Sequence, residues 1–190
     1  MLLLGIFGQL SIYIMNREII PKGRFQLIIE RFCYQLIEHH GNFEHTVLIG
    51  MQPRGIYLAK AVQQHLQKIK NGQEIPLGTL DVTFYRDDFR RRPEPMMPQF
   101  NEMEFLVEGK NVVLIDDVLY TGRTVRAALE ALMDYGRPDK VDLLVLVDRI
   151  YSRHLPIEPD YVGIEVDTRV SQNVKVNWTA EGEAENVVLL

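Results

Sequence analysis

The sequence predicts an α/β fold in which helices flank a central, mostly parallel sheet. Three observations support this prediction. Short, wholly apolar runs such as residues 112–115 have the pattern of strands that are buried on both faces. Amphipathic segments alternate with these runs, as they do in strand–helix–strand units. The 190 residues, 46% hydrophobic and 25% charged, are enough for a sizeable core in one domain.

Charge and cysteine content restrict the class of protein. The formal net charge of −5 gives no overall attraction to nucleic acid or acidic membranes. The single cysteine, Cys33, excludes a disulfide within the chain and fits a reducing compartment, so we expect a cytoplasmic protein.

Residues 1–14 are almost wholly apolar, but they are too short for a membrane-spanning helix, which needs about 20 residues. They also lack the positive residues and cleavage site of a signal peptide. We expect an N-terminal extension, either a gene start placed too early or, less favoured, an apolar arm that packs on a neighbouring subunit. Residues 15–190 would then form a single domain.

The first half of the chain is predicted to hold a helix, a strand and a second helix. Apolar residues recur every three or four positions over 23–40, which predicts an amphipathic helix whose last turn contains two histidines. Residues 46–50 are typical of a buried strand, and 56–70 of a helix. The turn between them, Met51-Gln52-Pro53-Arg54-Gly55, combines an arginine with a glycine and can bind an anion. Taken alone, this turn fits a plain connection better.

A strand and a long loop follow. Residues 77–84 alternate in polarity and predict a strand. The polar, proline-containing segment after it is typical of a lid or a disordered segment. Tyr85 and Arg86 are candidates for reaching a ligand, whereas for Arg90, Arg91 and Arg92 we favour solvated surface.

The stretch 112–129 is the centre of the prediction. A buried strand runs into Asp116 and Asp117, and a polar turn, Tyr120-Thr121-Gly122-Arg123-Thr124, leads into a helix. Glycine, threonine hydroxyls and the N–H groups at a helix start favour phosphate binding. Two carboxylates would repel a phosphate unless the ligand carries hydroxyls between its charges, as a ribose 5-phosphate does. The acids would then bind the ribose hydroxyls and favour positive charge on the ring. The alternative is that the acids merely cap a helix.

The last third of the chain is predicted to hold one more buried strand, residues 141–147. Asp148 and Arg149 lie at its carboxyl end, the edge where α/β sheets bind ligands. Two strand-like fragments within 174–190 are expected to close a small hood over the site.

The stretch 112–129 resembles the PRPP-binding signature of type I phosphoribosyltransferases. Its string DDVLYTGRTVRA closely resembles the PyrR family, the uracil phosphoribosyltransferase and pyrimidine-operon regulator. The resemblance runs from about Met15 to Trp178 and includes IGMQPRGIYLAK, LDVTFYRDD and VLVDR. It implies the type I phosphoribosyltransferase fold with a small hood and a mobile loop, and a homo-oligomer (dimer or higher). Residues 155–163 resemble the PyrR segment that covers the base.

The resemblance also implies a reaction, in which uracil and PRPP give UMP and pyrophosphate. Mg²⁺ would be held mainly by PRPP and water, without a strong direct protein ligand. The implied catalytic residues are Asp116, Asp117 and Arg54. The implied binding elements are a 5-phosphate loop (Tyr120, Thr121, Gly122, Arg123, Thr124), a pyrophosphate loop and lid (Met51, Gln52, Pro53, Arg54, Gly55, Tyr85, Arg86) and a base region (Asp148, Arg149).

Two alternatives stay open, namely an RNA-binding transcription attenuator with little enzyme activity and a phosphoribosyltransferase for another base. Tyr120 stands where purine enzymes often place an acid, which favours a pyrimidine. Family members that bind messenger RNA typically have a His-Arg pair after the base region, where this chain has Ser152-Arg153 with His154 displaced. Candidate contacts to the leader RNA of pyrimidine genes are Arg17, Arg24 and Arg153.

Overall fold

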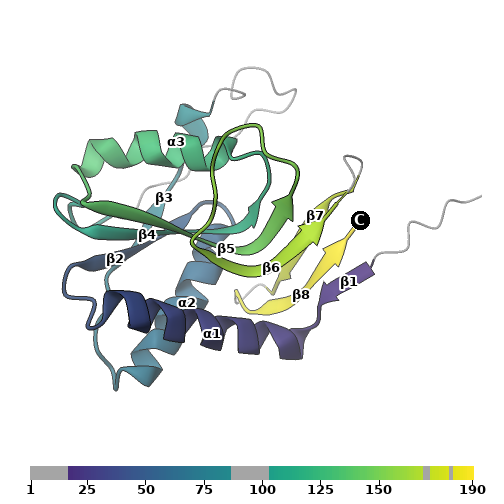
Figure 1. Ribbon diagram of the computed structural model, residues 1–190. Helices are drawn as coiled ribbons and strands as arrows, with labels where there is room; N and C mark the ends of the chain where they lie inside the picture. The colour runs from purple at the N-terminus through teal and green to yellow at the C-terminus, as the bar shows by residue number, and fades with distance from the viewer. Residues whose placement is uncertain (1–16, 87–102, 169–171, 180–181) are drawn as a thin grey trace, which may run out of the picture.

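Five parallel strands form the central sheet of the computed structural model (Figure 1), which describes residues 17–86, 103–168, 172–179 and 182–190. The strand order is β3-β2-β4-β5-β6. Each strand pairs in parallel with its neighbours. The strands are β2 (Thr46–Met51), β3 (Leu77–Leu80), β4 (Asn111–Leu119), β5 (Lys140–Ile150) and β6 (Tyr161–Asp167).

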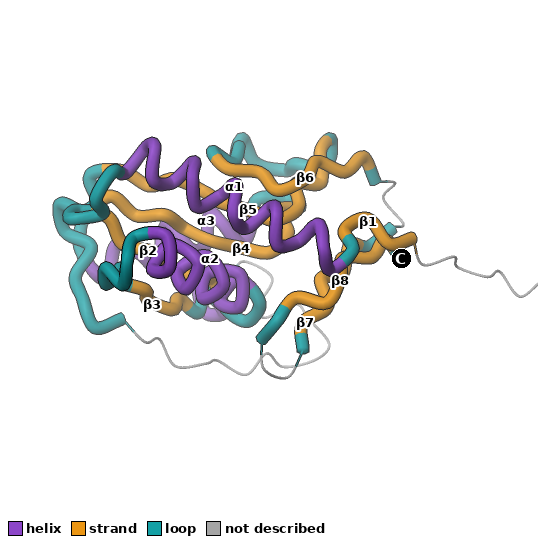
Figure 2. The backbone as a smooth tube through the Cα atoms, turned by 90° about the horizontal axis from the view of Figure 1, so that it is seen from below, coloured by secondary structure: helices purple, strands orange, loops and turns teal. Residues whose placement is uncertain are grey.

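Helices cover both faces of this sheet. The helices α1 (Lys22–His40) and α2 (Gly55–Ile69) pack on one face, and α3 (Arg123–Leu132) packs on the other (Figures 1 and 2). Successive residues of β4 pack alternately against the helices on one face and on the other, because side chains alternate along a strand. Val113 and Ile115 pack in the core under α1 and α2, whereas Val112 and Leu114 pack with α3. This double burial explains the wholly apolar run and confirms the predicted α/β fold.

A second, three-stranded antiparallel sheet forms the hood. Its order is β1 (Arg17–Ile20), β8 (Ala184–Leu189) and β7 (Val174–Trp178). The indole of Trp178 meets Phe25 edge-on, with ring centroids 5.5 Å apart, and stacks on Tyr57 with centroids 5.6 Å apart. These aromatic contacts fasten the hood to α1 and α2. Its third strand, β1, was not predicted.

Three strand predictions were wrong in extent, and one of them is that of residues 141–147, because β5 continues through Asp148 and Arg149 to Ile150. β3 ends at Leu80 instead of continuing to residue 84, because the carboxylate of Asp81 accepts the N–H of Thr83 over 2.8 Å and turns the chain into the 3₁₀ helix η1 (Thr83–Tyr85). Residues 116–119 continue β4, so the acid pair lies within the strand and not after it.

The structure of residues 155–163, the segment expected to cover the base, was only partly predicted. Residues 155–160 form a loop, but Tyr161 begins the edge strand β6, which pairs with β5.

The ends of the parallel strands define two edges of the sheet. We call the end at Met51, Leu119 and Ile150 the carboxyl edge, and the end at Thr46 and Lys140 the amino edge.

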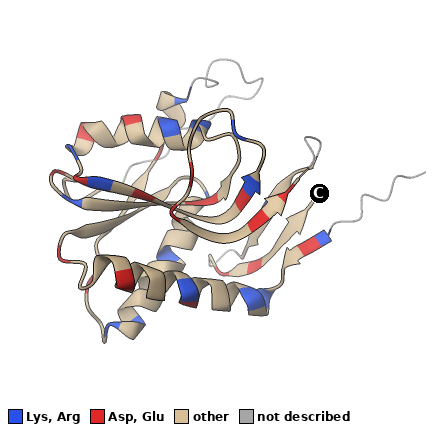
Figure 3. Ribbon diagram, viewed as in Figure 1, with Lys and Arg blue, Asp and Glu red and all other residues tan. Residues whose placement is uncertain are grey.

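Figure 3 shows cationic and acidic residues interspersed over the ribbon, without separation onto two faces. Within the described ranges, no helix is long and apolar enough to cross a membrane.

Candidate active site

Asp116 and Asp117 lie at the carboxyl edge, near the end of the central strand β4. Asp117 is only 7% exposed, and its backbone N–H donates to Oδ1 of Asp116 over 2.9 Å. The other carboxylate oxygen, Oδ2 of Asp117, is buried and has no hydrogen-bond partner in the described part of the chain. Such an atom is costly to bury unless a ligand satisfies it.

Burial raises the pKa of both acids. The pKa of Asp116 is well above its usual range, first because the carboxyl group is buried and second because the charge of Asp117 is adjacent. The pKa of Asp117 is raised by burial, against the opposing charge of Arg54 and a hydrogen bond from the Val118 backbone. Two carboxyl groups that resist ionisation together would be stabilised as anions by a positive charge beside them.

The turn after β2 packs directly against the acid pair, because β2 and β4 are neighbours. A Cβ atom added to Gly55 would lie 2.4 Å from the carbonyl oxygen of Ile115 and 3.0 Å from Cα of Asp116. Any larger residue would therefore push the turn away from the acids. The exposed Arg54 precedes this glycine at the start of α2.

The other residues of this turn have structural contacts. Met51 is buried in the core, so its side chain cannot reach a ligand. The peptide bond between Gln52 and Pro53 is cis, and Nε2 of Gln52 donates to Oγ1 of Thr79 over 3.0 Å. The predicted pyrophosphate loop thus offers its backbone, Arg54 and the close approach at Gly55.

The predicted 5-phosphate loop forms a cradle at the start of α3. Gly122 has a φ of 85°, in the left-handed region that glycine adopts at little cost. Helix α3 begins at Arg123, an exposed residue, and the N–H groups of its first turn are suited to an anion. A cavity of about 100 Å³ lies here, bordered among others by Asp116, Arg86, Thr121 and Thr124. The loop and Asp116 therefore border one cavity, whereas Asp117 is not among the residues that line it.

Arg86 reaches this cradle. Its Nη1 donates to Oγ1 of Thr124 over 2.8 Å, and its charge acts on Asp116. It was predicted for the pyrophosphate side, but in the structure it lies beside the 5-phosphate loop.

Tyr85 points elsewhere. Its hydroxyl donates to the carboxylate of Asp134, which raises the pKa of Tyr85 to about 12. Its carbonyl oxygen accepts from Nη2 of Arg126 over 2.8 Å. Tyr85 thus anchors η1 to the α3 layer, because both of its polar groups are bonded there, and it does not border the cavity at the cradle. Arg90, Arg91 and Arg92 lie outside the described residues.

The base region lies beside the cradle because Asp148 of β5 pairs in register with Leu119 of β4. Arg149 is 4% exposed, and its guanidinium lies 3.9 Å from the ring centroid of Tyr120 in a cation–π contact. Nε of Arg149 donates to Oγ1 of Thr168 over 2.9 Å. Burial lowers the pKa of Arg149. This arginine therefore holds Tyr120 at the wall of the site.

Comparisons with known proteins agree with this geometry. A model of the phosphoribosyl transferase domain matches residues 16–181. "Bifunctional protein PyrR" from Geobacter sp. (strain M21) is 41% identical over 174 residues, which cover 92% of this chain and 97% of that protein. The protein of the same name from Latilactobacillus sakei subsp. sakei (strain 23K) is 40% identical over 177 residues, with 92% and 98% covered.

The chain belongs to the PyrR family of phosphoribosyltransferases. The predicted family is thereby confirmed.

Solved structures of other phosphoribosyltransferases share the fold. A hypoxanthine phosphoribosyltransferase from Staphylococcus aureus superimposes with a TM-score of 0.63 at 19% identity, over 80% of this chain and 79% of that chain. A hypoxanthine-guanine-xanthine phosphoribosyltransferase gives a TM-score of 0.64 at 16% identity, over 90% and 92%. At these identities the likeness establishes the fold alone, and it confirms the predicted type I phosphoribosyltransferase architecture.

The three arginines predicted to contact RNA are dispersed in this PyrR-family chain. Arg17 and Arg24 border a cavity of about 350 Å³ that also carries three acidic residues, Glu18, Glu165 and Asp167. Arg153 lies at the carboxyl edge, beside the phosphate cradle, where its guanidinium contacts the ends of β4 and β5. Sequence reasoning missed this inward position because nothing in the pattern around residue 153 distinguishes a surface arginine from one that binds backbone carbonyls.

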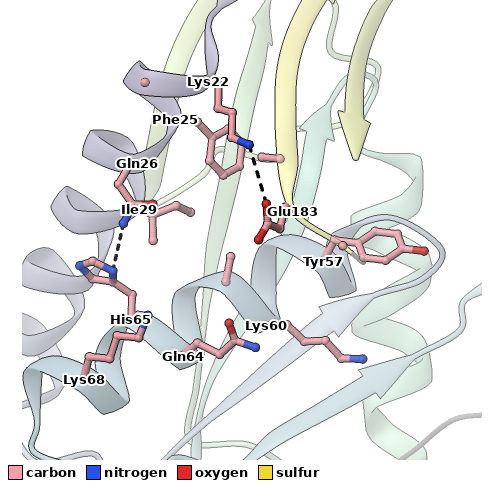
Figure 4. Close-up of a pocket in the computed structure, with 14 residues that line it drawn as sticks. Lys22, Phe25, Gln26, Ile29, Tyr57, Lys60, Gln64, His65, Lys68 and Glu183 are labelled. Carbon is pink, nitrogen blue, oxygen red and sulfur yellow. Dashed lines mark hydrogen bonds and ion pairs between the residues drawn. The ribbon is translucent and has the colours of Figure 1, made fainter. Parts of the chain in front are cut away.

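A larger cavity, of about 780 Å³, lies away from the acid pair (Figure 4). It is a groove between α1, α2 and the turn before β8. Lys22, Lys60 and Lys68 border it, and Glu183 faces Lys22 at 3.8 Å. Nε2 of Gln26 is 3.3 Å from Nδ1 of His65 within the same groove. The lysines outnumber the one acidic residue that borders this groove, Glu183.

Proposed function

We propose that this PyrR-family chain is a uracil phosphoribosyltransferase, which converts uracil and PRPP into UMP and pyrophosphate. The observation that carries the proposal is the acid pair, in which Asp116 borders the same cavity as the phosphate cradle and Oδ2 of the buried Asp117 has no hydrogen-bond partner in the described chain. Ribose hydroxyls are the donors that such an oxygen lacks. The family match to proteins named PyrR supports the transferase reading.

Positioning and electrostatics would carry the reaction. The 5-phosphate would bind on the loop 120–124, and Asp116 and Asp117 would hold the ribose hydroxyls. N1 of uracil forms the new bond to the anomeric carbon as the bond to pyrophosphate breaks, and the electron pair leaves with pyrophosphate. The proton on N1 of uracil is released to solvent. Asp116 and Asp117 stabilise the positive charge on the ring, and Arg54 neutralises the leaving group.

Mg²⁺ fits the chemistry of this donor set. Carboxylate oxygens suit this hard cation, and the raised pKa of Asp116 indicates that a positive charge beside the pair would be favourable. Within the described ranges, no group of three or more His, Cys, Asp or Glu side chains is arranged to hold a metal. The ion would be held mainly by PRPP oxygens and water, with Asp116 and Asp117 close enough to favour its charge. When bound, Mg²⁺ supplies charge neutralisation of the pyrophosphate.

The choice of a pyrimidine rests on Tyr120. A purine ring would gain from an acid at this position, whereas the Tyr120 ring offers an apolar wall held by Arg149. Residues 155–160 would cover the base from above.

A base panel tests the proposal. The full chain is incubated with PRPP, Mg²⁺ and either uracil, orotate, hypoxanthine or guanine, and nucleotides are separated by chromatography. We expect UMP to form fastest, and its formation to stop without PRPP or after chelation of the metal. Faster turnover of hypoxanthine or orotate than of uracil would reject the pyrimidine assignment.

RNA-binding regulation by a homo-oligomer is a second candidate function. Two observations favour it, the word "Bifunctional" in the names of the PyrR relatives and the groove that carries Lys22, Lys60 and Lys68 (Figure 4). RNA binding through phosphates requires such clustered cations and weakens steeply with salt. This groove replaces Arg153 as the surface to test, together with Arg17 and Arg24.

A gel-shift titration with the leader RNA of the organism's own pyrimidine genes tests this second role. We expect salt-sensitive binding that UMP strengthens and that a triple Lys22→Ala, Lys60→Ala, Lys68→Ala variant loses. A leader of scrambled sequence is the control. Absence of a shift at low salt would leave the enzyme activity alone, and light scattering on the same sample would report the oligomeric state.

A further inference from the structure

Arg153 lies where three segments at the carboxyl edge meet. Its Nη1 donates to the carbonyl oxygen of Tyr120 over 2.6 Å and to that of Arg149 over 3.1 Å. Its Nε donates to the carbonyl oxygen of Ile157 over 3.0 Å. Nη2 forms an ion pair with Asp148, and the Arg153 side chain is 20% exposed. One guanidinium thus joins the ends of β4 and β5 to the loop that precedes β6.

The loop around Arg153 also contacts the phosphate cradle directly. The backbone N–H groups of His154 and Leu155 donate to the carbonyl oxygen of Thr121 over 3.0 Å and 3.3 Å. The hydroxyl of Ser152 donates to the carbonyl oxygen of Tyr120 over 3.2 Å. Residues 152–157 therefore lie against the cradle and share hydrogen bonds with it.

We propose that Arg153 is a positioning residue that sets the geometry of the 5-phosphate loop and couples it to the base side of the site. The inference rests on the proposed phosphoribosyltransferase function. Because a peptide unit is planar, holding the carbonyl oxygens of Tyr120 and Thr121 on one side also fixes the N–H groups that follow them. Those N–H groups are the donors that a phosphate would meet.

Arginine is suited to this role by its shape. The planar guanidinium presents five N–H donors in a fixed fork, so it can bind carbonyl groups on several sides at once. A lysine would keep the charge opposite Asp148, but its single ammonium cannot reach the carbonyl groups of Tyr120 and Ile157 in the same fork geometry. The same bonds leave the guanidinium poorly placed for an RNA phosphate.

The affinities of different ligands should depend on Arg153 to different extents. UMP and PRPP carry a 5-phosphate that depends on the loop 120–124, whereas pyrophosphate alone depends on the turn at Arg54. Loss of Arg153 should therefore weaken the first two ligands and spare the third.

Isothermal titration of the full chain with UMP, PRPP and pyrophosphate tests this distinction. We expect Arg153→Gln to raise Kd for UMP and PRPP about 10-fold, since small losses of positioning have effects of this order or larger. Pyrophosphate should keep its affinity within about twofold, since it binds at an independent subsite. Arg153→Lys should restore the thermal stability, through its charge beside Asp148, but only part of the UMP affinity. The exposed Arg137→Gln is the matched control and should leave all three affinities unchanged.

Each outcome is decisive. Unchanged UMP affinity in Arg153→Gln, or equal weakening of UMP and pyrophosphate, overturns the positioning role. A drop in melting temperature with a normal UMP affinity would mean that Arg153 serves stability alone. If Arg153→Gln weakens UMP binding as expected but the wild-type protein forms no UMP from uracil and PRPP, the proposed enzyme function is rejected and the positioning role is kept. A wild-type protein that binds neither UMP nor PRPP overturns both.

Discussion

The two edges of the parallel sheet each hold a buried acid, but in opposite circumstances. At the amino edge, Asp142 is 1% exposed and has two basic neighbours, with Nζ of Lys140 at 2.7 Å and Nε2 of His40 at 3.4 Å. The hydroxyl of Tyr161 is 3.2 Å from the same His40 nitrogen. At the carboxyl edge, Asp117 has another acid as its neighbour. In both Asp117 and Asp142, Oδ2 is buried without a hydrogen-bond partner in the described chain, but Oδ2 of Asp142 lies 3.4 Å from Nε2 of His40.

This difference separates a structural cluster from a binding one. At the amino edge, Asp142 lies beside the ammonium of Lys140 and the imidazole of His40, and the contacts of His40 with Asp142 and Tyr161 tie α1 to β5 and β6. At the carboxyl edge the adjacent carboxylates of Asp116 and Asp117 repel each other, and a ligand with hydroxyl donors or a positive charge would complete them. Mutations should therefore have opposite effects at the two edges, on stability at one and on activity at the other.

Asp117→Asn should give the largest effect. The substitution keeps the shape but removes the charge that would stabilise the transition state, and loss of one such contact costs about 10²–10³ in rate. Stability should be unchanged or higher, because the repulsion with Asp116 disappears. Steady-state kinetics and thermal unfolding measure the two effects, and the exposed Asp139→Asn is the control. Unchanged turnover in both Asp117→Asn and Asp116→Asn would contradict the assigned roles.

Arg54→Ala should give the next largest effect, again at the carboxyl edge. It removes a charge-assisted hydrogen bond to pyrophosphate oxygens, which is expected to weaken PRPP and pyrophosphate binding by about 1.5–3 kcal/mol. UMP should be affected less, since it has no group in the pyrophosphate subsite. Titration calorimetry distinguishes the cases, and equal weakening of all three ligands would assign Arg54 a general role in the turn.

Much of this contrast could be predicted from sequence for the carboxyl edge and little of it for the amino edge. The acids, the Thr-Gly turn and the Arg-Gly turn are contiguous motifs, so their spacing alone placed them at one edge. The amino-edge cluster assembles from α1, β5 and β6, and such contacts have no local pattern. The sequence pattern predicted only that His40 lies in the last turn of a helix, whereas in the structure its Nε2 is 3.4 Å from a carboxylate oxygen of Asp142.

The lack of a local pattern for contacts between distant segments also explains why the contacts of Tyr85, Arg86 and Arg153 were not predicted. Tyr85 and Arg86 are adjacent, and polarity made both candidates for a ligand. Their side chains diverge because η1 replaces the predicted strand, which sends one to Asp134 and the other to Thr124. Arg153 was predicted to contact RNA. Its actual contacts could not be predicted, because a sequence does not show which backbone carbonyl groups surround an arginine.

Asp142→Ala should give the converse result at the amino edge. It leaves His40 and Lys140 without their carboxylate, and loss of a buried partner costs about 1–3 kcal/mol of unfolding free energy. The rate at saturating substrate should be unchanged, because the site lies at the other end of the sheet. Urea denaturation with activity assays would check both statements. A variant that lost activity but kept its stability would break the proposed division between the edges.

The smallest effect concerns the pH dependence of stability. Burial lowers the pKa of His40, and this outweighs the opposing charge of Asp142. Unfolding returns the imidazole to its ordinary pKa of about 6.5. Just below this value the unfolded chain binds a proton that the folded chain does not, so stability falls as the pH drops through this window and is fully present above it.

His40→Gln should therefore reduce this pH dependence. Urea unfolding at about pH 7.5 and about pH 5.5 compares the variant with the wild type, and titration of groups shared by both proteins cancels in the difference. The exposed His45→Gln is the matched control and should keep the wild-type slope. Lys140, Asp142, His39 and Tyr161 face the same imidazole, and they are unchanged in both variants. Parallel pH profiles for wild type and His40→Gln would show that the amino-edge histidine is not held neutral by its burial, and the contrast between the two edges would then rest on the acids alone.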